Sequence, residues 1–355
     1  MTSSPTMSAL VVREDSPQSL RLSKEPIPIP QPNKTQVLVK ISHAAQNPTD
    51  GITAVQSLDN RAFGDGAVLG CDFVGEVVEV GSSVRRYAKG DIIAGLIWGG
   101  ETPGLGAYSE YTLADERISY PVSGCNISRE HASTVPLAAA TAWLALFSKG
   151  CLGIDCNQQK GISVLIWGGS SSVGLYAIQL ATMYGLEVIT TCSPKHAELV
   201  RSHGARHVLD YKDDQVVDKI KKVAPTLSYA FDTIGNPASS STASCAFQTE
   251  TGSLCTVRPG KANTEKVASG TRVTDVLVWT SFFKDHTYGE FKWPASKSDH
   301  ELSAELFDKL PSWLQKGALK PSLPKLRQGL DSVPEGFQEY RDGEISGYKI
   351  VYALN

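Results

Sequence analysis

The stretch SVLIWGGSSSVGLYAIQLATMYG, residues 163–185, constrains the fold more than any other part of this chain. A short apolar run ends on two glycines and three serines, and a helical pattern of apolar residues follows at once. A buried strand that passes through a tight turn straight into a helix is typical of parallel α/β sheets. Such a turn directs backbone N–H groups and the positive end of the helix at one spot, which suits a pyrophosphate.

The turn resembles the dinucleotide-binding pattern G-x-G-x-x-G, with Gly169 in the first position and Gly174 in the last. We expect Gly169 to permit the tight turn and Gly174 to permit close packing of helix on strand. The middle glycine is replaced by a serine, which is small enough for a phosphate to approach and adds a hydroxyl. The predicted cofactor contacts of this turn are Ser170, Ser171, Ser172 and Val173. A plain turn that binds nothing is the alternative.

The strand after this helix indicates which dinucleotide to expect. Enzymes that bind NAD usually carry Asp or Glu at the end of that strand, where the carboxylate holds the ribose 2′-hydroxyl. Here the strand ends TTCSPKH, with no acidic residue and with Lys195, which would attract a 2′-phosphate. The sequence therefore predicts NADP(H), unless Lys195 is simply a solvated residue at a helix start. The expected contacts are Ser193, Pro194, Lys195, His196 and, at the adenosine end, Tyr211.

Secondary-structure patterns divide the 355 residues into three parts and predict an α/β fold class. Residues 1–130 are rich in proline and glycine and show strand patterns, which predicts an all-β domain of the twisted-barrel kind. Residues 131–278 alternate helix and strand, which predicts a parallel sheet; the segment that begins at His131 is expected to be helical. Residues 279–355 are mixed, and their last strand, YKIVYAL, could return to either sheet. The proline-rich run EPIPIPQPNKT is expected to connect two strands.

Composition argues against several classes of partner. A net charge of −3 gives no basic surface for nucleic acid. No apolar run approaches the roughly 18 residues that a membrane span needs. The N-terminal residues lack the basic and apolar regions of a signal peptide. The seven cysteines form no C-x-x-C pair, so we expect reduced thiols in a cytoplasmic protein.

Several segments occur in the order seen in medium-chain dehydrogenases/reductases: EPIPIPQPNKTQVLVKISHAAQNPTDG, VLGCDFVGEVVEVGSSVRRYAKGD, GAYSEY, GGSSSVGLYAIQLATMYGLEVITTCSPK and GARHVLDYKD. The chain resembles the zinc-free, quinone-oxidoreductase-like branch of that superfamily. Two further stretches, GLIWGGETPGLGAYSEY and FFKDHTYGEFKWPASKSDHE, resemble the trans-acting enoyl reductases that serve fungal polyketide synthases.

This resemblance implies a specific domain organisation. Residues 1–130 would form a GroES-like β-barrel catalytic domain, and residues 131–278 a Rossmann NADP-binding domain with a doubly wound parallel sheet. Residues 279–355 would return to the catalytic domain and to the cleft between the two domains, where the active site is expected.

Zinc needs a separate test, because many members of this superfamily are zinc alcohol dehydrogenases. A catalytic zinc requires thiolate and imidazole ligands. Where such enzymes carry the first cysteine this chain reads QNPTDG, and where they carry histidine it reads LGCDF. Residues 85–115 hold no cysteine for a structural zinc. Cys71 and Asp72 are better explained as a core cysteine beside an aspartate in a turn, so we expect no metal.

Without zinc, the expected reaction is reduction of an activated double bond, which needs no Lewis acid. The resemblance implies hydride transfer from NADPH to the β-carbon of an enoyl thioester and protonation of the resulting enolate. We expect backbone N–H groups and the nicotinamide ribose hydroxyl to hold the enolate oxygen. The proton comes from water or a tyrosine; Tyr108 and Tyr288 are candidates, and no catalytic residue is assigned.

The remaining site residues follow from the same resemblance. Many relatives carry N-P-x-D-x-K, but here Ile52 replaces the lysine, which argues against a lysine proton donor. Further cofactor contacts are expected from Asn47, Pro48, Thr49, Asp50, Thr256, Val257, Ile345 and Ser346. The substrate wall is expected at Thr134, Val135, Pro136, Leu137, Ala138, Ala139, Ala140, Thr141, Val278, Trp279, Thr280, Ser281 and Phe282. Packing of helix on helix would explain some of these alanines equally well.

Three functions remain open at this point. The first is a trans-acting enoyl reductase of secondary metabolism, working on a chain tethered to a polyketide synthase. The second is a free-standing quinone or alkenal reductase, and the third is an NADPH-binding protein without catalysis. The segment that contains WPAS favours the first, and the apparently complete cofactor site argues against the third. Charges and a proline near the edge of the predicted sheet, in KDHTYGEFKWPASKSDHE, predict a monomer that meets the synthase transiently.

Overall fold

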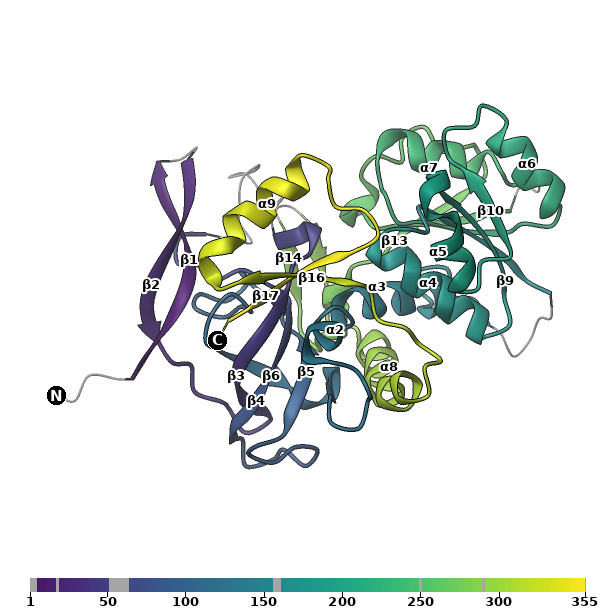
Figure 1. The fold of residues 1–355 in the computed structure, drawn as a ribbon. Helices are drawn as coiled ribbons and strands as arrows, with labels where there is room; N and C mark the ends of the chain where they lie inside the picture. Colours follow the sequence, from purple (N-terminus) through teal and green to yellow (C-terminus); the bar gives the residue numbers. More distant parts are fainter. Residues whose placement is uncertain are drawn as a thin grey trace.

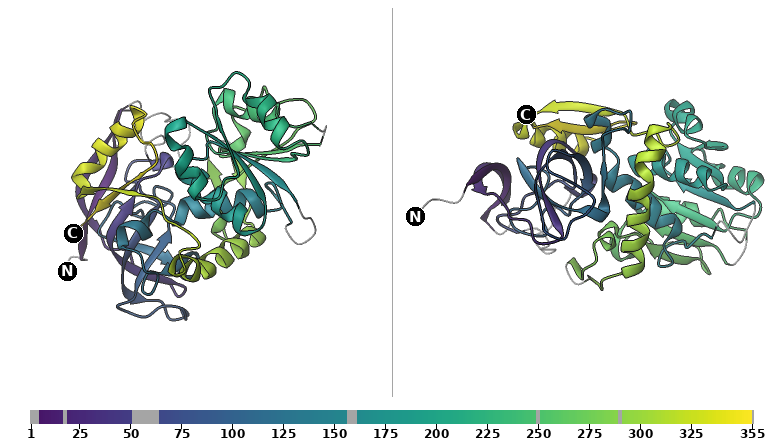
Figure 2. Two further views of the ribbon diagram at one scale, coloured as in Figure 1. Left: turned by 45° about the vertical axis from the view of Figure 1, so that its right-hand side comes forward. Right: turned by 90° about the horizontal axis from the view of Figure 1, so that it is seen from below.

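The computed structural model describes residues 5–16, 19–50, 64–155, 161–248, 251–288 and 291–354. They form two lobes that lie side by side (Figure 1). One lobe contains a parallel sheet flanked by helices, and the other is built around a mostly antiparallel sheet near both chain ends (Figure 2). The expected α/β fold class is confirmed.

Six parallel strands form the sheet of the first lobe, in the order β10-β9-β8-β11-β12-β13. Counted along the chain, this is the 3-2-1-4-5-6 order of the doubly wound dinucleotide-binding fold. The strands are β8 (Ser163–Trp167), β9 (Glu187–Cys192), β10 (His207–Asp210), β11 (Tyr229–Asp232), β12 (Ser253–Thr256) and β13 (Arg272–Asp275).

Successive side chains of β8 point to opposite faces of this sheet. Val164 and Ile166 join the core that includes residues of α3 and α4, whereas Leu165 and Trp167 join a second core with residues of α6 and α7. Helices therefore cover both faces, which explains why the strands of this sheet are so apolar. The helices are α3 (Pro136–Phe147), α4 (Ser172–Met183), α5 (Ala197–Ser202), α6 (Val216–Val223) and α7 (Pro237–Ser244).

The second lobe contains a seven-stranded sheet in the order β16-β17-β3-β4-β5-β7, with β6 also paired to β3. Its pairings are antiparallel apart from that of β16 with β17. The C-terminal strand thus returns to this sheet and not to the parallel one. The strands are β3 (Gln36–Ala45), β4 (Asp72–Val80), β5 (Ile92–Leu96), β6 (Tyr111–Asp115), β7 (Ser119–Pro121), β16 (Pro324–Gln328) and β17 (Lys349–Ala353).

Part of the proline-rich run that we expected to be a connection is a strand. β1 (Thr6–Ser16) pairs with β2 (Ser19–Pro28) in an antiparallel hairpin, and β2 includes Pro26 and Pro28. Proline is tolerated there because each strand of a two-stranded sheet is an edge strand, with one side free of ladder hydrogen bonds. The expectation is therefore wrong for the first residues of this run.

The helical segment that begins near His131 is interrupted once. α2 (Arg129–Ser133) ends before Thr134, and α3 begins at Pro136, because proline restricts the residue before it but fits the first helical turn.

The remaining elements are α8 (Lys297–Gln315), which packs against α3, α9 (Val333–Arg341), and a hairpin of β14 (His286–Tyr288) and β15 (Phe291–Trp293). No helix in the described ranges is long and apolar enough to cross a membrane.

Candidate functional site

The glycine turn joins β8 to α4 at the carboxyl edge of the parallel sheet. Gly168 carries the positive backbone angle of this turn, with φ of 85°, so the tight turn depends on Gly168 and not on Gly169 as predicted. Gly169 is needed for space, because a Cβ there would lie 2.1 Å from Thr190 Oγ1. Gly174 allows α4 to approach the turn closely, since its Cβ would lie 2.4 Å from the Gly168 carbonyl oxygen.

Ser171, which replaces the middle glycine, is the N-cap residue of α4. Its Oγ accepts a hydrogen bond from the Gly174 backbone N–H at 2.9 Å and lies 2.8 Å from Thr233 Oγ1. The other predicted contacts, Ser170, Ser172 and Val173, are half-buried around the same helix start. Small polar side chains and unpaired N–H groups at a helix start suit a pyrophosphate, so these residues fit a dinucleotide.

A buried carboxylate shapes the neighbouring loop, which follows β11. Thr233 Oγ1 lies 2.9 Å from the carbonyl oxygens of both Trp167 and Gly168 and so holds the glycine turn. Asp232 accepts four hydrogen bonds from the residues that follow it: from Ile234 N, Gly235 N, Ser239 Oγ and Ser240 Oγ. Sequence reasoning missed Asp232; an acidic residue ending an apolar strand, before a glycine, is the signal that could have found it.

The residues expected at the 2′-phosphate lie together after β9. Lys195 and Pro194 are exposed, whereas Ser193 and His196 are half-buried. Burial and the nearby Lys195 charge lower the pKa of His196, so its imidazole is neutral at neutral pH. Because the His196 imidazole is neutral, the positive charge of segment 193–196 is on the exposed Lys195 side chain.

Tyr211 lies on the same edge of the sheet, one strand further along. It follows β10, whose last residue, Asp210, pairs in register with Cys192 at the end of β9. The Tyr211 side chain is 43% exposed, and the Lys212 ammonium lies 5.7 Å from the centre of its ring. The position of Tyr211 beside the adenosine end of the cofactor stays a prediction.

Two predicted segments reach this edge from elsewhere in the chain. Ser346, between α9 and β17, has its Oγ 2.5 Å from His196 Nε2, which links the two lobes, and Ile345 beside it is half-buried. Thr256 is buried at the end of β12, in register with the end of β11, and Val257 is half-buried. With the glycine turn, the fold therefore brings residues from five separate segments to one edge of the sheet.

Asp50 is the centre of a buried network in the second lobe. It is 2% exposed and accepts hydrogen bonds from the Asn47 backbone N–H at 2.7 Å, the Tyr108 hydroxyl at 3.0 Å and Cys71 Sγ at 3.1 Å. Burial raises the pKa of Asp50 to about 6 and raises the pKa values of Cys71 and Tyr108 well above their usual range. Tyr108 is therefore a buried donor to Asp50, which argues against it as the direct proton donor.

The two residues between Asn47 and Asp50 are less buried than this network. Pro48 is exposed and Thr49 is half-buried at the start of a helix that begins at residue 48. Ile52 and the side chain of Tyr288 lie outside the described residues.

Asp72 connects this network to β17 and to the start of α3. It is fully buried at the start of β4, not in a turn as predicted, and its Oδ2 lies 2.6 Å from Lys349 Nζ. Oδ2 also accepts a hydrogen bond from Asn47 Nδ2 at 2.9 Å, and Oδ1 accepts one from the Leu137 backbone N–H at 2.7 Å. Sequence analysis missed this anchor; the available signal was a lysine at the start of the apolar strand KIVYA.

The first part of the predicted substrate wall lies at the junction of α2 and α3. All residues from Thr134 to Thr141 are buried. Thr134 Oγ1 donates to the His131 carbonyl at 2.8 Å and lies 3.4 Å from the Tyr176 hydroxyl. The alanines at 138–140 belong to the main core, so helix packing accounts for their burial, and their contact with a substrate stays a prediction.

The second part of the wall is the turn η4 (Val278–Ser281), whose residues are all buried. Trp279 stacks on Trp98 with ring centres 4.8 Å apart and an interplanar angle of 2°. Ser281 Oγ lies 2.8 Å from Ser303 Oγ of α8, and Phe282 is half-buried. Trp98 was not predicted; its place in GLIWGG, directly after an apolar strand, was the only sequence signal.

Cys71 and Asp72 do not fit a zinc site. The Cys71 thiol donates to Asp50 and has a raised pKa, and the Asp72 carboxylate is paired with Lys349. Within the residues that the structure describes, no group of three or more His, Cys, Asp or Glu side chains is arranged to hold a metal ion. The donor groups present are therefore unlike the thiolate and imidazole set that zinc prefers.

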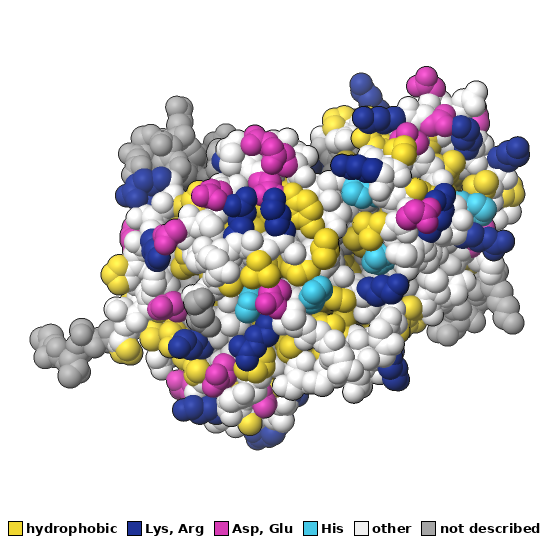
Figure 3. Space-filling model, viewed as in Figure 1, with side chains coloured by type: hydrophobic (Ala, Val, Ile, Leu, Met, Phe, Trp, Pro, Cys, Tyr) yellow, Lys and Arg dark blue, Asp and Glu magenta, His cyan; other side chains and the backbone are white. Residues whose placement is uncertain are grey.

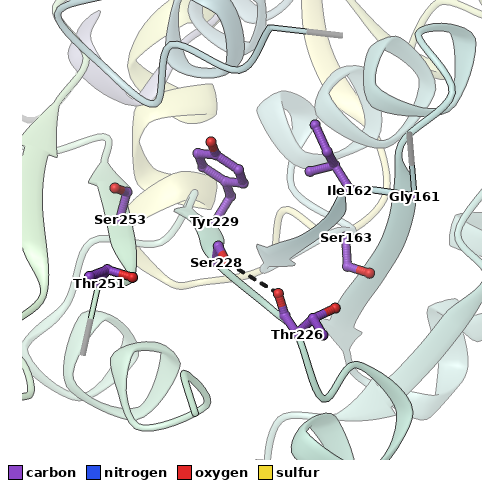
Figure 4. Close-up of a pocket in the computed structure, with 8 residues that line it drawn as sticks. All are labelled: Gly161, Ile162, Ser163, Thr226, Ser228, Tyr229, Thr251 and Ser253. Atoms are coloured by element: carbon purple, nitrogen blue, oxygen red, sulfur yellow. Dashed lines mark hydrogen bonds between the residues drawn. The ribbon is translucent and has the colours of Figure 1, made fainter. Parts of the chain in front are cut away.

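One hollow lies at the opposite end of the parallel strands (Figure 4). It is at the amino ends of β8, β11 and β12, whereas dinucleotides bind at the carboxyl ends of such strands. It is therefore separate from the candidate site. Its lining residues are Gly161, Ile162, Ser163, Thr226, Ser228, Tyr229, Thr251 and Ser253.

Two segments of this chain match known protein families. Residues 33–124 match the family described as the alcohol dehydrogenase GroES-like domain. Residues 172–279 match the family described as zinc-binding dehydrogenase. The first match lies in the antiparallel lobe, and the second runs from α4 to η4 in the parallel-sheet lobe.

Known proteins resemble the chain along almost its whole length. The trans-enoyl reductase ACTTS2 of Alternaria alternata is 31% identical, and the alignment covers 99% of each chain. A zinc-type alcohol dehydrogenase-like protein of Schizosaccharomyces pombe is 31% identical, covering 92% of this chain and 95% of that protein. Among solved structures, the CurK enoyl reductase matches with a TM-score of 0.77 and 18% identity over 99% of each chain, which shows a shared fold.

Proposed function

Since the chain belongs to the medium-chain dehydrogenase/reductase superfamily, we propose that it is an NADPH-dependent enoyl reductase acting in trans on polyketide thioesters. Similarity to a trans-enoyl reductase over almost the whole chain supports the reaction class. The structural observation that carries the proposal has two parts. The turn between β8 and α4 has the capped helix start that a dinucleotide needs, and the Cys71 thiol is hydrogen-bonded to Asp50. A site of this kind suits hydride transfer that proceeds without zinc.

The chain's own residues have to orient the reacting groups and exclude water. When bound, the nicotinamide supplies the hydride that reduces the β-carbon of the enoyl thioester. Ser170 to Val173 would hold the phosphates of the cofactor at the start of α4, and Asn47 to Asp50 would line its nicotinamide end. The segments 134–141 and 278–282, which are buried apart from the half-buried Phe282, form the wall that positions the acyl chain. Backbone N–H groups stabilise the negative charge that develops on the thioester oxygen.

The proton for the α-carbon comes from water in this proposal. Tyr108 is 0% exposed and its hydroxyl donates to Asp50, so the phenol is held away from direct transfer. Burial keeps the pKa of Tyr108 well above its usual range, which makes it a poor acid near neutral pH. Water that enters with the substrate needs no dedicated side chain.

The preference for NADPH rests on Lys195 and Ser193. Lys195 is an exposed cation at the end of β9, and no acidic residue is in the segment Ser193–His196 to hold a ribose 2′-hydroxyl. A charge-assisted contact between an ammonium and the 2′-phosphate favours NADPH over NADH.

A comparison of substrates tests the proposed function. The purified protein is given NADPH with an enoyl chain on an acyl carrier protein, the same chain on N-acetylcysteamine, a quinone and an alkenal. We expect reduction of both thioesters, with the carrier-bound chain reduced faster. Equal rates for the two thioesters would remove the case for a dedicated synthase. Faster turnover of the quinone or alkenal would favour a free-standing reductase. If none of the four substrates is reduced, the protein is better explained as one that only binds the cofactor.

A further inference from the structure

Arg258 is a cation at the candidate site, and it is not among the residues predicted to contact the cofactor or the substrate. It follows β12 at the carboxyl edge of the parallel sheet and is half-buried. Its Nε donates to the Gly235 carbonyl at 2.9 Å, and within the described ranges neither of its Nη groups has a hydrogen-bond or ion-pair partner. A guanidinium held at Nε, with both ends open, is preorganised to bind an oxyanion through two hydrogen bonds.

The loop 258–263 that carries this arginine is held in an unusual conformation. Gly260, Lys261 and Asn263 have positive φ angles of 68°, 58° and 67°. Residues other than glycine rarely adopt such angles without specific contacts. Asn263 Nδ2 provides one such contact by donating to the Gly235 carbonyl at 2.9 Å. Strained backbone that is fixed by specific contacts is common at ligand sites.

Arg258 lies between the glycine turn and the second lobe. Its side chain covers Gly235, where a Cβ would lie 2.5 Å from Arg258 Cγ. Gly235 follows Thr233, which contacts Ser171 of the turn. On its other side, the Arg258 charge acts on Tyr340 of α9, whose pKa is raised by burial and lowered in part by this guanidinium. α9 belongs to the opposite lobe (Figure 1), so this interaction indicates that Arg258 lies where the two lobes face each other. Figure 3 shows Lys and Arg side chains on both lobes of this side of the molecule.

The distance from the glycine turn distinguishes two sources of a phosphate. β12 is two strands away from β8, and neighbouring strands lie about 5 Å apart, so the end of β12 lies about 10 Å from the turn. A pyrophosphate at the start of α4 would therefore be bound mainly by the turn. Arg258 is better placed for an anion that enters between the lobes with the substrate.

We propose that Arg258 binds the phosphate of a phosphopantetheine arm that brings the enoyl thioester into the site. This inference rests on the proposed enoyl reductase function and names the group by which a carrier-bound substrate is recognised. A half-buried guanidinium that has no carboxylate paired with it among the described residues is costly, and a phosphate that arrives with the substrate would supply the missing negative charge. The pyrophosphate of the dinucleotide is the other possible source of the same chemical group.

The test compares three variants with the wild type. Arg258→Met keeps the apolar stem over Gly235 and removes the guanidinium, and Arg258→Lys keeps the charge but loses the bidentate geometry. Arg117→Gln removes an exposed arginine on the second lobe and is the control. Calorimetry measures binding of 4′-phosphopantetheine and of NADPH, and kinetics measures KM for an enoyl thioester of coenzyme A and of N-acetylcysteamine.

We expect Arg258→Met to weaken binding of 4′-phosphopantetheine about tenfold to a hundredfold, with Arg258→Lys in between. KM should rise for the coenzyme A thioester and stay unchanged for the N-acetylcysteamine thioester, which has no phosphate. If Arg258→Met weakens only the binding of NADPH, this assignment is overturned, and the arginine binds the cofactor instead. Unchanged binding of both ligands would overturn any phosphate role. If wild type reduces neither thioester, the proposed function fails, and 4′-phosphopantetheine binding still tests Arg258.

Discussion

Asp50 is an acid whose ionisation the fold makes costly. Burial raises its pKa from 3.8 to about 6, and the hydrogen bonds from Asn47 and Tyr108 offset only part of this effect. Folding therefore takes up a proton between these two values. The stability that the protonated form contributes is present below about pH 4 and is lost as the pH rises through about 6.

Replacing Asp50 by Asn removes this pH dependence. We expect the free energy of unfolding of the wild type, relative to Asp50→Asn, to fall by about 2 kcal/mol between about pH 4 and about pH 7. Urea denaturation at several pH values measures this difference. A difference that stays constant over that range would show that Asp50 titrates normally.

Lys195 should determine the choice of cofactor. We expect Lys195→Gln to weaken NADPH binding about tenfold to a hundredfold while leaving NADH binding unchanged, because only NADPH carries the 2′-phosphate. Titration of cofactor fluorescence measures both affinities. Lys222→Gln, an exposed lysine of α6, is the matched control and should alter neither. Equal affinities of the wild type for the two cofactors would remove the basis of the NADPH assignment.

At the scale of elements, the serine caps of α4 and α8 form a matched pair. Ser171 Oγ accepts from the Gly174 N–H at 2.9 Å, and Ser296 Oγ accepts from the Asp299 N–H at 3.2 Å. Loss of such a cap typically costs about 1 kcal/mol of stability. We expect Ser171→Ala and Ser296→Ala to destabilise the protein similarly in thermal unfolding, but only Ser171→Ala to weaken NADPH binding. A similar effect of both on the cofactor would indicate that Ser171 acts through stability alone.

The Asp72–Lys349 pair connects β4, β17 and the start of α3. Lys349→Met leaves a buried carboxylate without its counter-charge, and we expect this to cost about 3–5 kcal/mol. The double variant Asp72→Asn, Lys349→Met removes both charges and should be more stable than Lys349→Met alone. Chemical denaturation of four proteins, the wild type, Lys349→Met, Asp72→Asn and the double variant, measures this coupling. A double variant whose loss equals the sum of the single losses would mean that the two residues do not interact.

Local patterns predicted the strand–turn–helix unit and the alternation of the parallel-sheet lobe, because both depend on neighbouring residues. The anchors Asp72 and Trp98 were missed because their partners are distant in the sequence: Asp72 pairs with Lys349, 277 positions away, and Trp98 stacks on Trp279. Asp232 was missed although its partners lie within eight positions of it, because a glycine and serines after a strand also suit an ordinary connection to a helix. The positive φ of Gly168 was assigned to the wrong glycine for a different reason. A pair of glycines satisfies the pattern either way, and only the crowding of Gly169 against Thr190 decides between them.

At the scale of the whole molecule, we predict a monomer. β13 is an edge strand of the parallel sheet, and a hairpin of β14 and β15 follows it. Lys284 near this hairpin is paired with Glu101, and Asp285 accepts a hydrogen bond from Ala295 N at 2.8 Å, so these charges hold the segment in place. Light scattering at micromolar concentration should give the mass of one chain. A stable dimer mass would refute this prediction.

The fate of the transferred hydrogen tests the central claim most directly. The protein is incubated with NADPH that carries deuterium at the transferring position of the nicotinamide and with an enoyl thioester, and the product is analysed by mass spectrometry and NMR. We predict one deuterium at the β-carbon and one solvent proton at the α-carbon, with the thioester carbonyl intact. Deuterium at a carbinol carbon would contradict the proposed enoyl reduction and indicate a carbonyl reductase instead.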